Sequence, residues 1–96
     1  EYLLVDADLV SLMPVNLSFS EAAALPLVSI TAWEALVDKL KVPSGKTLLV
    51  HGGLGGVGHI AAQLGRHLGA TIYTTISKEE DRALSKEYGA DFTINY

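Results

Sequence analysis

The sequence predicts an α/β fold in which short parallel strands alternate with helices. Three runs rich in β-branched and aliphatic residues, at 47–50, 71–76 and 92–94, have the length of buried strands and are too short for helices. The stretches between these runs carry apolar residues at helical spacing and end at Gly69 and Gly89. Because the connections are short and right-handed crossovers are favoured, we expect a parallel β-α-β-α-β unit of strand order 3-2-1.

A glycine-rich turn joins the first of these strands to the helix that follows it. Residues 53–58 read Gly-Leu-Gly-Gly-Val-Gly, a G-x-G-x-x-G motif between a strand and a helix, which is the context that indicates dinucleotide binding. In such a motif Gly53 permits a tight turn, Gly55 lets a pyrophosphate approach the backbone, and Gly58 lets helix and strand pack closely.

Helical periodicity begins at this turn, with Val57 as its first apolar position, and the free N–H groups and positive dipole end of the new helix would face the phosphates. Gly56 and Val57 are therefore expected to bind the cofactor together with Gly53, Gly55 and Gly58. A plainer interpretation is that the glycines only shape a tight connection. Four glycines within residues 53–58 argue against it, because each weakens the local structure and such a connection needs only one or two. The motif therefore predicts the first βαβαβ half of a Rossmann-type three-layer fold.

A short strand and helix segment is expected to precede this unit. Residues 2–5 and 9–12 have the composition of short strands, and Ser18 with Glu21 has the spacing of a capping box that begins a helix. Pro26 would end or kink that helix. A second helix over about 30–40 would bury one apolar stripe, in which Trp33 serves as core packing. The stripe consists of Ile30, Trp33, Leu36, Val37 and Leu40.

Two further helices are expected in the β-α-β-α-β unit. The helix after the glycine turn would bury Val57, Ile60, Ala61, Leu64 and Leu68. Residues 77–80, Ser-Lys-Glu-Glu, have the spacing of a second capping box. The helix that it opens would bury Ala83, Leu84 and Tyr88.

Composition excludes several classes of protein. The chain has 96 residues, a net charge of -4 and no cysteine, so disulfides and thiolate metal sites are excluded. Its seven Lys and Arg residues form no cluster that could follow a nucleic-acid backbone. No apolar run approaches the ~20 residues that span a bilayer, and no signal peptide is visible. We expect a cytoplasmic protein without nucleic-acid or membrane partners.

The residues after the second strand bear on the choice between NAD and NADP. An NAD-preferring fold places an acidic residue near the end of this strand, where it bonds the ribose 2′-hydroxyl. Here Ser77 and Lys78 occupy that region, and Arg82 lies one helical turn further on. These donors favour a 2′-phosphate and thus NADP(H). The alternative is that Ser77 is a helix cap and both cations are solvated, and the acids at 79–81 also lower the local charge.

Several linked stretches resemble the medium-chain dehydrogenase/reductase superfamily, within it the quinone oxidoreductase or zeta-crystallin-like branch. The resemblance covers nearly the whole chain. It rests on residues 17–26, 30–36, 49–58, 68–70 and 89–96.

The resemblance implies the cofactor-binding part of an NADPH-dependent oxidoreductase that reduces a quinone or an activated C=C or carbonyl substrate by hydride transfer. It also implies that residues 1–17 are the tail of a missing GroES-like catalytic domain and that 18–96 are part of an NAD(P)-binding Rossmann domain. The chain alone would then be inactive, since it lacks a closed pocket for nicotinamide. We expect the whole protein to be a homo-oligomer.

Individual residues acquire roles through the same resemblance. Thr31 matches a threonine placed against the nicotinamide end, although its hydroxyl could equally bond back to the preceding helical turn. Ser77, Lys78 and Tyr96 match positions that contact the 2′-phosphate or adenine-ribose end. Leu27 occupies the position of a zinc-ligand Cys in zinc-dependent alcohol dehydrogenases, and because leucine cannot bind zinc we expect a zinc-free enzyme.

Catalytic residues are not identified. His59 and His67 lie off the apolar stripe and are expected at the surface, whereas His51 follows the central strand and could approach the cofactor. Three alternatives stay open: an enoyl-reductase domain of a polyketide or fatty-acid synthase, a zinc-type alcohol dehydrogenase relative, and a non-catalytic nucleotide-binding protein. Fold alone does not decide among them.

Overall fold

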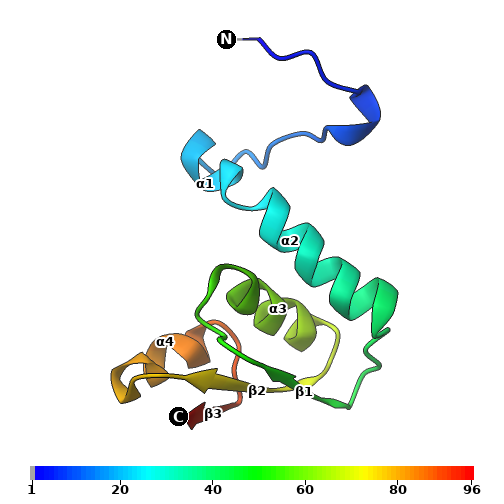
Figure 1. Cartoon of the computed structure of the whole chain (residues 1–96). Helices are drawn as coiled ribbons and strands as arrows, with labels where there is room; N and C mark the ends of the chain where they lie inside the picture. The colour runs from blue at the N-terminus through cyan, green and yellow to red at the C-terminus, as the bar shows by residue number, and fades with distance from the viewer. Residues whose placement is uncertain (1) are drawn as a thin grey trace.

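The strands form one three-stranded parallel sheet, which lies below helix α3 in the view of Figure 1. The structure, a computed structural model, describes residues 2–96. Strand β2 (Thr71–Ile76) lies between β1 (Thr47–Val50) and β3 (Phe92–Asn95), and both pairings are parallel. The predicted fold class and the strand order 3-2-1 are confirmed. The three predicted runs are too short for helices and form strands, and the middle strand β2 pairs with the other two.

Helices α3 (Gly56–His67) and α4 (Arg82–Glu87) cover the same face of this sheet. A Cβ on Gly65 of α3 would meet the side chains of Leu48 and Ile72, and Arg82 of α4 bonds Thr93, which stands beside Thr74 on that face. Of the expected three layers, residues 2–96 thus supply the sheet and one helical layer.

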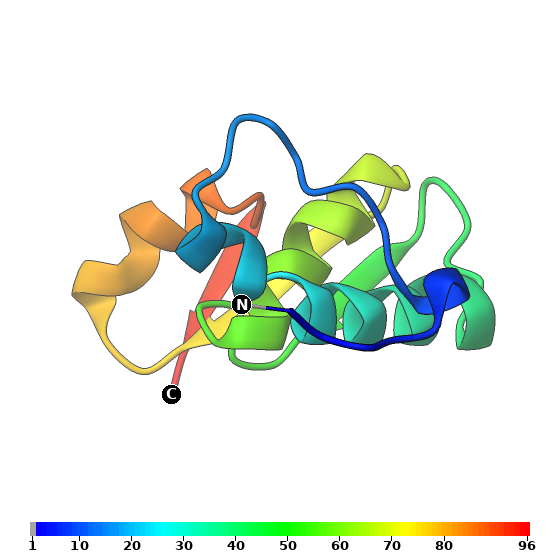
Figure 2. The same ribbon diagram turned by 90° about the horizontal axis from the view of Figure 1, so that it is seen from above.

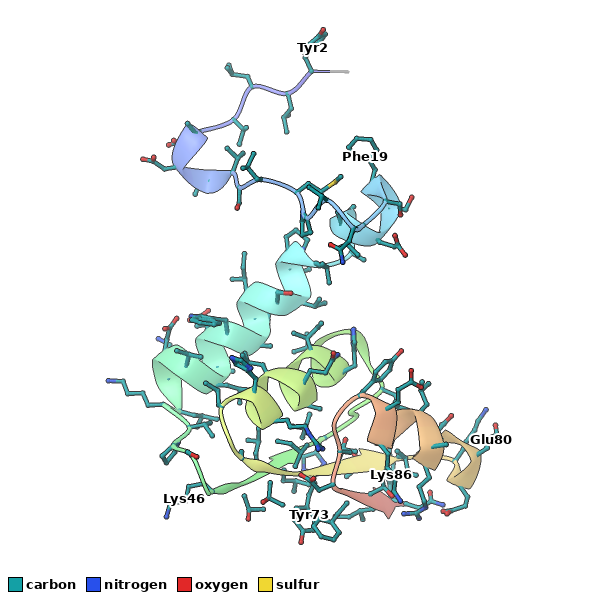
Figure 3. The ribbon with its side chains drawn as sticks, turned by 180° about the vertical axis from the view of Figure 1, so that it is seen from behind. Tyr2, Phe19, Lys46, Tyr73, Glu80 and Lys86 are labelled. Carbon is teal, nitrogen blue, oxygen red and sulfur yellow. The ribbon has the colours of Figure 1, made fainter. Side chains whose placement is uncertain are left out.

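The other face of the sheet carries apolar side chains. Tyr73 and Phe92 stack on neighbouring strands with their ring centroids 4.6 Å apart, and Figure 3 shows Tyr73 extending away from α3. Leu49 and Phe92 remain 48% and 50% exposed. This face is accordingly apolar yet open within the described residues.

The prediction of strands at 2–5 and 9–12 is wrong, since neither segment forms a strand. Over residues 2–17 the chain is extended or turned, with a single short 3-10 helix, η1 (Ala7–Leu9), capped by the Asp6 carboxylate, which accepts from Asp8 N at 3.0 Å. Apolar residues alone do not make a strand, since a strand requires a partner for its backbone groups. Tyr2 lies at the far end of this segment, away from the sheet (Figure 3). The expected tail 1–17 includes Glu1, which lies outside the described residues.

The capping box at Ser18 is confirmed and begins helix α1 (Phe19–Ala23). Ser18 N donates to the Glu21 carboxylate at 2.8 Å, and Glu21 N donates to Ser18 Oγ at 3.3 Å. These hydrogen bonds from Ser18 lower the pKa of Glu21 below its ordinary value of 4.5.

The next helix begins earlier than predicted. Helix α2 (Pro26–Trp33) starts at Pro26 itself, because proline is well tolerated in the first helical turn, and it continues as the π-helical turn η2 (Glu34–Lys39). The predicted stripe is largely wrong: Ile30 and Trp33 are 67% and 53% exposed. Leu40 is exposed as well, whereas Leu36 is buried as predicted and Ala32, outside the predicted stripe, is buried too.

Small residues explain this choice of buried face. Helix α2 runs beside α3 (Figure 2). The buried residues of α3 are glycines and alanines, which let neighbouring backbones approach closely and leave little room for large side chains between helices. They are Gly58, Ala61, Ala62 and Gly65. The rest of the predicted α3 stripe packs against this core, except Val57, which is exposed.

The last helix also differs from the prediction. No side-chain cap forms at Ser77; the chain passes through Lys78 in an extended conformation into the 3-10 turn η3 (Glu79–Asp81), and α4 begins at Arg82. Ser85 is buried, whereas the expected Ala83 and Leu84 are exposed. Gly69 and Gly89 end α3 and α4 as predicted, with φ of 88° and 96°.

No helix among residues 2–96 is both long enough and apolar enough to cross a membrane.

We predict that Gly58→Ala destabilises the fold by about 3 kcal/mol, since the new methyl group meets rigid backbone. A Cβ at Gly58 would lie 2.1 Å from the Gly52 carbonyl oxygen. Gly65→Ala is the matched control, because its Cβ meets only side-chain ends, Leu48 Cδ2 at 2.7 Å and Ile72 Cδ1 at 2.9 Å. Urea unfolding measures both variants, and equal losses would contradict the backbone argument.

Candidate functional site

The turn between β1 and α3 is compact and closed by its own backbone. Gly55 N donates to Gly52 O at 2.8 Å. Gly52 adopts the left-handed conformation, with φ of 65°, so the tight turn depends on Gly52 rather than on Gly53 as predicted. Gly53 is required for a different reason, since a Cβ there would lie 1.9 Å from Thr74 Oγ1.

The third motif glycine has the expected packing role. A Cβ on Gly58 would collide with the carbonyl oxygen of Gly52, so only glycine lets the first turn of α3 lie against the loop that precedes it. The start of the helix is thereby fixed relative to the end of β1.

The N-terminus of α3 is open to solvent. Gly55 is the N-cap, it offers no side-chain cap, and Gly55, Gly56 and Val57 are all exposed. The N–H groups of the first helical turn have no acceptor within the helix and carry the positive end of its dipole. An uncapped helix of 12 residues with an exposed glycine entry has the geometry of an anion-binding site.

Ser77, Lys78 and Tyr96 gather at the ends of β2 and β3. Tyr96 N donates to Ile76 O at 3.2 Å, which places Tyr96 beside the residues that follow β2. All three side chains are exposed. Because the strands are parallel, their carboxyl ends and the glycine turn lie at the same edge of the sheet.

Arg82 is held by neighbouring groups. Its Nη2 donates to Glu79 Oε2 at 2.8 Å, and its Nη1 donates to the carbonyl and hydroxyl oxygens of Thr93. The Arg82 guanidinium lowers the pKa of Glu79 below its ordinary value of 4.5, and Glu79 in turn raises the pKa of Arg82. The guanidinium charge is therefore offset by a carboxylate at close range.

Lys78 is bound less firmly. Its Nζ lies 3.6 Å from Glu80 Oε1, and both side chains are largely exposed, so the pair is screened and weak. Of the two predicted cations, Lys78 can turn toward an anion at low cost, whereas Arg82 would have to leave Glu79 and Thr93.

Thr31 lies on α2 with its hydroxyl engaged. Thr31 Oγ1 donates to Leu27 O at 2.7 Å, which is the alternative that the sequence left open. Leu27, which the resemblance places at the zinc-ligand position of zinc-dependent alcohol dehydrogenases, is exposed. In the described part of the chain no three His, Cys, Asp or Glu side chains gather as a metal site would require.

The three histidines differ in their surroundings. His51 and His67 are exposed, but His59 is half-buried and its ring lies against that of Tyr88, with the centroids 5.4 Å apart and the planes tilted by 49°. Its Nδ1–H donates to Gly55 O at 3.0 Å, which makes His59 part of the turn. This contact was not predicted, although its signal is local, since His59 lies four residues after the helix N-cap Gly55.

Two threonines of β2 also belong to the turn and were missed. Thr74 Oγ1 donates to Val50 O at 2.8 Å, and Gly52 N donates to Thr75 Oγ1 at 2.9 Å. Both contacts span more than 20 residues of sequence, so no local pattern could have indicated them.

Comparison with known proteins agrees with this geometry. Residues 56–96 match the family profile described as "Zinc-binding dehydrogenase". The 2-methylene-furan-3-one reductase of Solanum lycopersicum is 48% identical over 97 residues, covering 100% of this chain and 25% of the reductase. A highly reducing polyketide synthase of Cryptosporiopsis sp. is 46% identical over 84 residues, covering 86% of this chain and 4% of the synthase.

Solved structures show the same fold. A mycobacterial protein in complex with NADPH aligns with a TM-score of 0.81 and 41% identity over 86% of this chain and 26% of its own. The quinone oxidoreductase of Coxiella burnetii aligns with a TM-score of 0.80 and 42% identity over 88% of this chain and 26% of its own. This chain thus spans less than a third of the length of the proteins that it matches.

The glycine turn, the parallel sheet and these relatives lead to one conclusion: the chain belongs to the medium-chain dehydrogenase/reductase superfamily and is similar to part of the NAD(P)-binding domain of its members.

Proposed function

We propose that the protein is an NADPH-dependent oxidoreductase that reduces a quinone or an activated C=C or carbonyl group, and that this chain holds the dinucleotide. The observation that carries the proposal is the uncapped N-terminus of α3 next to a turn in which Gly53 and Gly58 leave no room for side chains. Such a turn brings backbone N–H groups to an exposed surface where phosphates can reach them.

The residues present suit a dinucleotide. The N–H groups at the start of α3 would receive the pyrophosphate, Ser77, Lys78 and Tyr96 the adenosine end, and Thr31 the nicotinamide end. When bound, NADPH supplies a hydride from its nicotinamide ring, which a conjugated acceptor takes up together with a proton.

Preference for NADPH is supported by the end of β2. No carboxylate occupies positions 77 and 78, where an NAD-binding protein would bond the ribose hydroxyls. Lys78 is the cation that can move toward a 2′-phosphate, while Glu79 holds Arg82 and opposes added negative charge. The solved NADPH complex of a relative supports the same choice.

Conjugated acceptors are supported by the relatives. The reductase of Solanum lycopersicum is named for an enone, and the Coxiella burnetii protein is a quinone oxidoreductase. The polyketide synthase match favours, as a second candidate, an enoyl-reductase domain of a multidomain synthase. Absence of zinc, a cytoplasmic location and homo-oligomeric assembly stay predictions from the sequence.

Lys78→Ala should weaken NADPH binding roughly tenfold and leave NADH binding unchanged, because only NADPH carries the 2′-phosphate. Calorimetric titration of the protein with each dinucleotide measures both effects. Lys46→Ala is the matched control: it removes the same charge at the opposite edge of the sheet, where Thr71 N bonds Lys46 O. Equal affinities of the unsubstituted protein for NADPH and NADH would refute the 2′-phosphate argument, and binding of neither would refute the function.

Glu79→Gln should have the opposite effect and raise NADPH affinity about threefold relative to NADH. The substitution removes a negative charge and releases Arg82 from its carboxylate partner. Glu87→Gln, at the last residue of α4, makes the same change of charge without an ion pair to Arg82 and serves as the control. A fall in NADPH affinity in Glu79→Gln would show that the Glu79–Arg82 pair orders the site rather than opposing the phosphate.

A further inference from the structure

We propose that Thr75 is a positioning residue whose hydroxyl holds the glycine turn in the conformation that receives the dinucleotide phosphates. The proposal rests on the proposed function and adds a residue to its site. Thr75 lies near the carboxyl end of β2, and Thr75 Oγ1 accepts a hydrogen bond from Gly52 N at 2.9 Å. The neighbouring Thr74 bonds the carbonyl oxygen of Val50, the last residue of β1. Two adjacent threonines of β2 therefore contact the chain where β1 ends and the turn begins.

The hydroxyl groups act where backbone pairing stops. Strands β1 and β2 pair from Thr47↔Thr71 to Val50↔Thr74, and beyond Val50 the chain turns away toward α3. The N–H of Gly52 therefore has no backbone acceptor on β2 in that ladder, and Thr75 Oγ1 supplies one. The Thr75 side chain thus continues the hydrogen bonding between β2 and this part of the chain to Gly52, two residues beyond the end of β1.

Gly52 is the residue through which this bond acts on the phosphate site. Its carbonyl oxygen accepts from Gly55 N at 2.8 Å and lies 2.1 Å from the position that a Cβ on Gly58 would take. Gly52 has a φ of 65°, a conformation that glycine adopts freely among several others. Because the residue itself is flexible, a hydrogen bond from outside the turn is needed to select this one conformation. Fixing the Gly52 N–H consequently fixes the orientation of the peptide groups from which α3 starts.

Thr74 secures the same turn from the helical face of the sheet. It is fully buried, donates to Val50 O at 2.8 Å and fills the space beside Gly53. Replacing Thr74 would therefore disturb the core itself. Thr75 points to the opposite face and is half-buried, so its hydroxyl can be removed without emptying the core.

The test compares Thr75→Val, which removes the hydroxyl at nearly constant volume, with Thr75→Ser, which retains it. Thr71→Val is the matched control, because Thr71 lies on the same face of β2 at its other end. NADPH affinity is measured by calorimetry, hydrogen exchange of the Gly52 amide by NMR, and thermal stability by circular dichroism.

We expect Thr75→Val to weaken NADPH binding about fivefold and to speed exchange of the Gly52 amide about tenfold, with Thr75→Ser and Thr71→Val close to the unsubstituted protein. Unchanged affinity in Thr75→Val, or an equal loss in Thr71→Val, overturns the positioning role. Loss of affinity that serine does not restore overturns it too, since the hydroxyl would not be the cause.

Failure of the proposed function has a different signature. If the unsubstituted protein binds neither NADPH nor NADH, the function and the phosphate part of this inference both fall. Exchange of the Gly52 amide then still decides whether Thr75 holds the turn, because that measurement requires no ligand.

Discussion

The close approach of helix α3 to the carbonyl group of Gly52 is the contact on which the rest of the structure depends. The start of the helix lies so near the preceding turn that Gly58 has no room for a Cβ, and the same turn excludes one at Gly53. This contact sets the direction of α3 over the sheet, which in turn determines which residues of β1 and β2 are buried. It also leaves the first helical N–H groups exposed at the carboxyl edge of the strands, where parallel α/β sheets bind their ligands.

The charged residues at that edge are balanced against one another. Glu79 holds Arg82 and keeps it beside β3, whereas Lys78 has only an exposed partner in Glu80. The region thus combines one weakly paired cation, Lys78, with an Arg82 whose charge is offset by Glu79. Selectivity for the 2′-phosphate would depend on this balance rather than on the number of basic residues.

Much of the fold could be predicted from local signals. Strand composition, glycines after helices and the G-x-G-x-x-G turn indicated the three strands, helix α3 and their order, and all are confirmed. The wrong predictions fall where a local signal allowed several outcomes. Apolar residues at 2–5 and 9–12 formed no strand because no partner lies beside them. The helix expected at Ser77 began only at Arg82, since no side-chain cap forms and Glu80, the carboxylate of the expected capping box, lies beside Lys78 instead.

The sequence by itself determined the alternation of strands and helices and the place of the glycine turn, because periodicity and glycine conformation act within a few neighbouring residues. Only the tertiary structure decided which faces are buried and which groups meet. Ala32 faces α3 in place of Trp33, since the buried face of α3 is made of glycine and alanine. Thr75 bonds Gly52 across 23 residues, and such a contact exists only once β1 and β2 lie side by side.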